Sequence, residues 1–159
     1  MVDCMIEPPE IFARIYARHG HRCPMSTLGG RLGLAAMRFL GDSPGTRQAV
    51  YSHQTCALDG IAEVTGCCED AGSLVVKNAG RHALILSAGK GSVEVELTAE
   101  ALAMAGGYRA LCNRLESGWE ALHKDEQFRR RTEMDAMLDA LLPQFWQADE
   151  QKLVQKVSG

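Results

Sequence analysis

The first forty residues show apolar side chains at helical spacing, interrupted by one short loop. Four of them predict a short helix that carries the chain towards His19: Ile11, Phe12, Ile15 and Tyr16. A second helix is expected to begin at Pro24, because proline suits the first helical position, and to end near Gly41. Gly29, Gly30 and Gly33 lower its helix propensity, which indicates that another backbone packs closely there.

The middle of the chain alternates apolar and polar residues, as strands do. Strands are predicted over residues 48–52, 73–77, 81–86 and 92–97. Between the first two, Thr55 is a candidate N-cap for a helix that Gly66 would end. The glycine-bearing links near residues 80 and 90 favour antiparallel pairing of the last three strands. The final strand alternates valine and leucine with glutamate, so one wet face and a place at the sheet edge are expected.

From Thr98 onward the pattern is helical, with a break predicted near Ser117 and Gly118. A strong apolar stripe follows between residues 134 and 146, and Pro143 is expected to end or kink that helix. The predicted fold class is α+β: a mixed, largely antiparallel sheet flanked by helices, with a helical C-terminal extension. We divide the chain into a core (residues 1–98) and an extension (residues 99–159) that packs on the core or on a partner subunit. The stripe therefore also predicts a homodimer.

Composition limits the range of functions. The chain has 159 residues, 46% of them hydrophobic and 23% charged, with a net charge of −3. These values are typical of a globular protein and give no footprint for nucleic acid. Neither a secretion signal nor an apolar run of about 18 residues is present, which predicts a cytoplasmic protein without a membrane partner. The six cysteines are then thiols, metal ligands or redox groups rather than structural disulfides.

The candidate chemistry lies in two cysteine-containing loops. Residues 19–24 read H-G-H-R-C-P, which places Cys23 at a helix start, where the helix dipole favours a thiolate. Cys56 lies at the start of the next predicted helix for the same reason. Neutral imidazole and thiolate are the donors that zinc and other borderline metals prefer. A site is therefore predicted from His19 or His21 with Cys23, and from Cys56 or Cys67 in the second loop.

The spacing leaves other interpretations open. The pattern H-x-H-x-C matches no common zinc finger, and no C-x-x-C occurs. The histidines could instead lie on the surface, and Cys23 and Cys56 could be small buried residues. Asp59 could orient a ligand histidine, act as a general base, or simply compensate the helix dipole. His53 is either an additional ligand or an ordinary polar residue at a strand end.

Several short motifs in order resemble one protein family. They are H-G-H-R-C-P at 19–24, C-A-L-D-G-I at 56–61, T-G-C at 65–67, G-S-L at 72–74 and N-A-G-R at 78–81. Together they are similar to the FmdE family, named for a component of formylmethanofuran dehydrogenase, over about residues 10–97. The resemblance implies an α+β core, sometimes described as thioredoxin-like. It also implies that the histidine and cysteine motifs surround an active site that holds zinc.

The chain departs from the family pattern at three places. Met25 stands where glycine usually follows Cys-Pro, and it is a candidate soft ligand or pocket wall. Cys68 stands where threonine is usual and adds a thiol that could contact a cofactor. No cysteine follows Cys112, so the C-terminal zinc finger of many members is expected to be absent, with helices in its place.

These observations support three functions. The first, which we adopt, is a metal-binding protein that holds a transition metal or metallocofactor for redox metabolism, in association with a redox enzyme complex. The second is a metal-dependent enzyme with an open coordination position and Asp59 as base. The third is a thiol redox protein that uses Cys23, Cys67 or Cys68. Zinc is the expected metal; iron or nickel, including in a tetrapyrrole, is the alternative, although C-x-x-C-H is missing.

Overall fold

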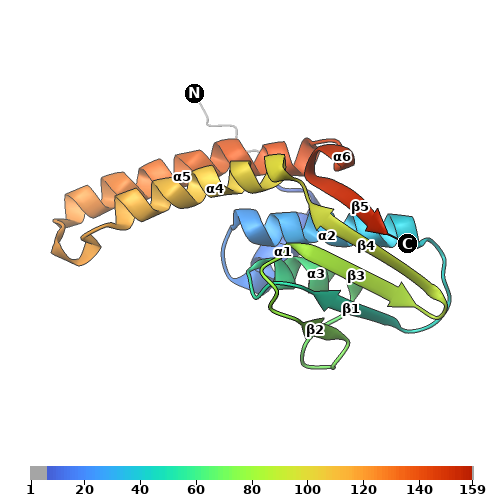
Figure 1. Ribbon diagram of the computed structural model, residues 1–159. Helices are drawn as coiled ribbons and strands as arrows, with labels where there is room; N and C mark the ends of the chain where they lie inside the picture. Colours follow the sequence, from blue (N-terminus) through green and yellow to red (C-terminus); the bar gives the residue numbers. More distant parts are fainter. Residues whose placement is uncertain (1–6, 159) are drawn as a thin grey trace.

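The structure, a computed structural model, describes residues 7–158 and has an α+β fold (Figure 1). Its helices are α1 (Glu10–His19), α2 (Pro24–Leu40), α3 (Ala57–Thr65), α4 (Ala99–Glu116), the 3-10 turn η1 (Trp119–Ala121), α5 (Lys124–Gln147) and α6 (Glu150–Leu153). Its strands are β1 (Arg47–Tyr51), β2 (Leu74–Val76), β3 (Ala83–Ala88), β4 (Gly91–Leu97) and β5 (Val154–Ser158). Residues 1–6, on which the expectation about a secretion signal rests, lie outside the described part. None of the described helices is long and apolar enough to cross a membrane.

The sheet has the strand order β2-β1-β3-β4-β5 and is mixed, as predicted. Strands β1 and β2 are parallel, and the other neighbours are antiparallel. The expected pairing of β2 with β3 is wrong, because β1 lies between them: Ala49 pairs with Leu74 on one side and with Leu86 on the other. The link between β2 and β3 crosses the end of β1, where Ala79 and Arg81 donate backbone hydrogen bonds to the Ser52 carbonyl.

Strand β4 does not lie at the sheet edge, which corrects the second expectation about the sheet. Strand β5 returns from the C-terminal end of the chain and pairs with it, with Leu97 opposite Val154. On the polar face of β4, Glu96 accepts a hydrogen bond of 2.9 Å from the side chain of Gln155. The segment after residue 98 therefore completes the sheet of the core, while the proposed division into two parts stays a prediction.

Helix α2 is the central helix, since it packs against α3, the sheet and α5. Four of its side chains are fully buried: Leu28, Leu32, Ala35 and Ala36. At Gly29 an added Cβ would lie 2.1 Å from the carbonyl oxygen of Ala57 in α3. The prediction of a close backbone approach is thus confirmed at Gly29, whereas Gly30 and Gly33 face side chains. This contact holds the starts of α2 and α3 together.

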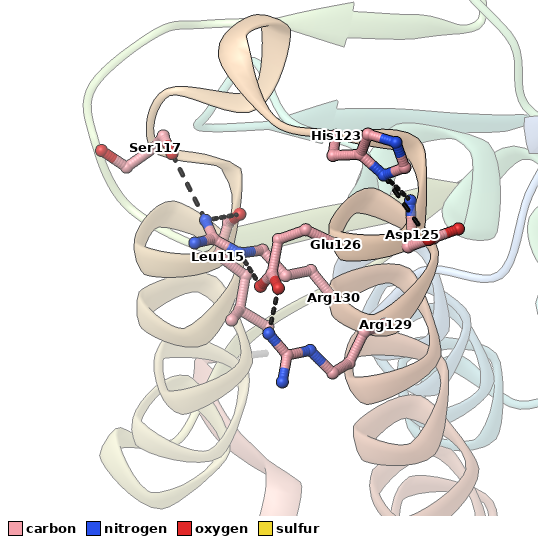
Figure 2. A network of polar contacts seen from close by, with 7 residues as sticks. All are labelled: Leu115, Ser117, His123, Asp125, Glu126, Arg129 and Arg130. Carbon is pink, nitrogen blue, oxygen red and sulfur yellow. Dashed lines mark hydrogen bonds and ion pairs between the residues drawn. The ribbon is translucent and has the colours of Figure 1, made fainter.

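Helices α4 and α5 form a long antiparallel hairpin that projects from the core (Figure 1). The predicted break is confirmed: α4 ends at Glu116, and Gly118 has a φ of 67°. Near the tip, Arg130 donates a 2.9 Å hydrogen bond to the Leu115 carbonyl and pairs with Glu126, which ties the two helices together (Figure 2).

The base of α5 is anchored on the core of the same chain. Pro143 does not end the helix, which runs on to Gln147. Three of its apolar side chains are buried in the core cluster: Leu141, Leu142 and Phe145. Arg31 of α2 donates hydrogen bonds of 2.8 Å to the carbonyl oxygens of Phe145 and Ala148. This end of the extension therefore packs on its own core.

Candidate metal centre

The two thiols lie at the starts of two helices. Cys23 is the N-cap of α2, with an extended backbone (φ −153°), and it is buried. Cys56 occupies the N-cap position of α3 and is exposed. The helix begins one residue later than predicted, because the Thr55 hydroxyl accepts a hydrogen bond from the amide of Ala57. Both cysteines thus precede the first helical residue.

His19 reaches the thiols from the end of α1. Gly20 has a left-handed φ of 96°, which lets the chain turn from α1 towards Cys23. One ligand atom each of His19, Cys23 and Cys56 lie within 4.8 Å of one another. In the described part of the chain this is the single group of at least three histidine, cysteine or acidic side chains with such spacing. Three of the five predicted ligands therefore meet.

The imidazole of His19 is held by Asp59. Its Nδ1 lies 2.8 Å from the Asp59 carboxylate, which accepts the ring proton. Its Nε2 is buried and has no hydrogen-bond partner among residues 7–158. A ligand histidine commonly donates its other N–H to a carboxylate, which fixes the tautomer and leaves the second nitrogen for the metal. The orphaned Nε2 and the soft donor set fit a metal ion, with Asp59 in the orienting position.

The surroundings of Cys56 do not favour a free thiolate. Burial raises the pKa of the Cys56 thiol most, and the neighbouring Cys23 and Asp59 raise it further, while Arg109 lowers it. The helix start alone therefore does not ionise Cys56, contrary to the sequence-based argument. A metal would have to displace this proton when it binds.

Two further predicted ligands lie outside the group of three. His21 is exposed, and its ring packs on that of His19 with 4.4 Å between the centroids. Cys67 is 1% exposed in the core and follows the C-terminal end of α3, whereas Cys56 precedes its start. A helix rises about 1.5 Å per residue, so this separation keeps Cys67 away from the site.

The two residues that depart from the family pattern lie on different sides of the centre. Met25 lines a hollow of about 420 Å³ together with Cys23 and Cys56, so it forms part of the wall beside the centre. Cys68 lines a separate hollow with Asp59. Only Met25 therefore shares a cavity with the thiols.

Helix α4 closes the other side of this hollow with Tyr108 and Arg109. Sequence reasoning did not select either residue. Arg109 is a single cation in a stretch of small and apolar residues, and its spacing to the cysteine loops carries no signal. Its position beside the centre arises only from the packing of α4.

The fold and the site define an α+β protein with a histidine–cysteine centre beneath a helical hairpin. Residues 18–155 match the family described as FmdE, molybdenum formylmethanofuran dehydrogenase operon, and the chain belongs to this family. The match includes the C-terminal helices, so the family likeness extends well beyond residue 97. A search of curated proteins found no match.

One solved structure with a similar fold is an FmdE-like protein of the tungsten formylmethanofuran dehydrogenase type from Syntrophus aciditrophicus. The TM-score is 0.59 at 23% sequence identity, over 94% of this chain and 71% of that one. At this identity the likeness supports the fold alone.

Proposed function

We propose that the protein binds one transition metal ion through Nε2 of His19 and the thiolates of Cys23 and Cys56, with Asp59 orienting the histidine. The observation that carries this proposal is the buried, unpartnered Nε2 beside two thiols. One imidazole and two thiolates suit zinc, and three protein ligands leave a fourth position open. Iron or nickel, free or in a tetrapyrrole, is the competing occupant.

The role we infer is that of a protein that holds its metal for redox metabolism, in contact with a redox enzyme complex. The support is the family to which the chain belongs, whose name refers to a dehydrogenase operon. We also place it in the cytoplasm, where the five free cysteines of the described part would stay reduced.

Metal analysis of protein purified without oxygen tests the centre. The wild type should contain about one equivalent of metal, and elemental analysis with an absorption spectrum identifies it. Cys23→Ser and Cys56→Ser should each lose it. Cys68→Ser is the matched control, because Cys68 lies outside the group of three, and it should keep the metal. Wild-type metal content in both Cys23→Ser and Cys56→Ser would disprove the proposal.

A metal-dependent enzyme is the second candidate, and the cavity beside the three-ligand centre favours it. Asp59 is already bonded to His19, which makes it a poor general base. Substitution with cobalt(II) distinguishes the candidates. Thiocyanate should change the cobalt absorption bands if the fourth position is open, whereas an unchanged spectrum indicates a closed site suited to storage.

We further propose that the protein is a homodimer. The hairpin of α4 and α5 projects from the core (Figure 1), and it carries Phe128, which is 69% exposed. Light scattering should give twice the chain mass, and Phe128→Glu should shift it towards the monomer. A monomer mass at all concentrations of the wild type would refute this assembly.

A further inference from the structure

A second hollow of about 590 Å³ adjoins the metal centre, between α4 and the ends of β1 and β3. It shares Cys56 and Arg109 with the hollow described above. Its wall combines apolar side chains, among them Met25 and Leu102, with a few polar groups. This combination is typical of sites for small molecules.

The charged and titratable groups of this wall have one sign in common. They are the guanidinium of Arg109, two imidazoles and the thiol of Cys56, and no carboxylate lines the hollow. Arg109 is exposed and forms no ion pair within 4.0 Å in the described part of the chain. A guanidinium in a cavity without an acid favours an anionic ligand.

The two imidazoles belong to His53 and His82, whose ring centroids lie 4.7 Å apart. Nδ1 of His82 lies 3.4 Å from the Tyr51 hydroxyl. Nδ1 of His53 is buried and lacks a hydrogen-bond partner among the described residues. A buried polar atom without a partner is costly, so such an atom in a cavity wall indicates a missing group.

We propose that this cavity binds a small organic acid, with its carboxylate on Arg109, its apolar body against Met25 and Leu102, and a polar group on His53. The apolar wall favours an organic acid over inorganic phosphate, and the absence of a lining carboxylate disfavours a cation. Because Cys56 borders the cavity, the acid would lie beside the open metal position. In this respect the inference rests on the proposed function.

Binding of matched probes tests the inference. Calorimetry and NMR titration of the purified full-length protein compare 4-phenylbutyrate with 4-phenylbutylamine and inorganic phosphate. The acid should bind, with shifts of the His53 ring resonances. Arg109→Gln should weaken its binding about tenfold or more. Arg114→Gln is the matched control, since Arg114 lies on the same helix, is 72% exposed and pairs with Glu133.

A second pair of variants tests the imidazole without relying on Arg109. His53→Leu should weaken binding of 4-phenylbutyrate, and His53→Asn, which restores a polar atom near the position of Nδ1, should recover most of it. Thermal unfolding of each variant confirms that it is folded.

Several results would overturn the inference: no binding of 4-phenylbutyrate by the wild type, equal binding of the amine or of phosphate, or wild-type affinity in Arg109→Gln. Metal content is measured in the same samples. Acid binding without metal contradicts only the metal proposal, whereas full metal content without acid binding contradicts only this one.

Discussion

The contact between α2 and α3 offers a sharp test of how the fold builds the metal centre. In Gly29→Ala the new Cβ would lie 2.1 Å from the carbonyl oxygen and 2.7 Å from the carbonyl carbon of Ala57, both of them backbone atoms. Carbon atoms in contact prefer separations of about 3.5–4.0 Å, so the two helices must move apart by roughly 1 Å. Ala57 directly follows Cys56, and Cys23 precedes α2. The shift therefore changes the distance between the two thiols.

The expected cost follows from two opposing effects. Overpacking a tight contact costs about 1–3 kcal/mol, while replacing glycine by alanine inside a helix returns about 1 kcal/mol. The free energy of unfolding should thus fall by about 1–2 kcal/mol. A ligand displacement of about 1 Å also exceeds the tolerance of roughly 0.2 Å for metal–ligand distances. Gly29→Ala should therefore lose metal as well as stability.

Urea unfolding and metal analysis of the same samples measure both effects. Gly107→Ala in α4 is the matched control, because no heavy atom lies within 4 Å of its added Cβ. It should gain about 0.5–1 kcal/mol and keep the metal. Gly60→Ala, whose Cβ would lie 2.1 Å from the Ser26 carbonyl oxygen, should repeat the defect from the opposite helix. Wild-type stability and metal content in Gly29→Ala would refute the reasoning.

Three further predictions concern individual side chains. Asp59→Asn should weaken metal affinity about 10–100-fold, because it loosens His19, and a chelator competition that shows no change would contradict this. Burial lowers the pKa of His82, so the unfolded chain binds its proton more tightly; stability should fall as the pH drops below about 6.5, and His82→Gln should flatten that loss in urea unfolding. Trp146→Phe removes the 2.9 Å hydrogen bond to the Tyr16 hydroxyl and should cost about 0.5–1.5 kcal/mol of unfolding free energy, whereas an unchanged value would argue against this contact.

Much of the fold could be predicted because it depends on residues close together in the sequence. Pro24 begins α2, Gly41 caps its end, and Gly118 follows α4, each at the predicted place. The strand order could not be predicted in the same way. Residues 154–158 are too short a segment to indicate a strand, and only pairing with β4 makes them one. The insertion of β1 between β2 and β3 likewise depends on contacts between distant segments.

The sequence by itself determined the chemistry of the centre: imidazole and thiol donors, each beside a turn or a helix start. Which donors meet was decided by the tertiary structure. Asp59 reaches His19 across 40 positions in the chain, and the packing of α2 on α3 brings Cys23 to Cys56 while α3 keeps Cys67 at its far end. Arg109 joins the same site only because α4 folds back over it. Helix starts depend on neighbouring residues, but a ligand set depends on the approach of whole helices, which no short motif encodes.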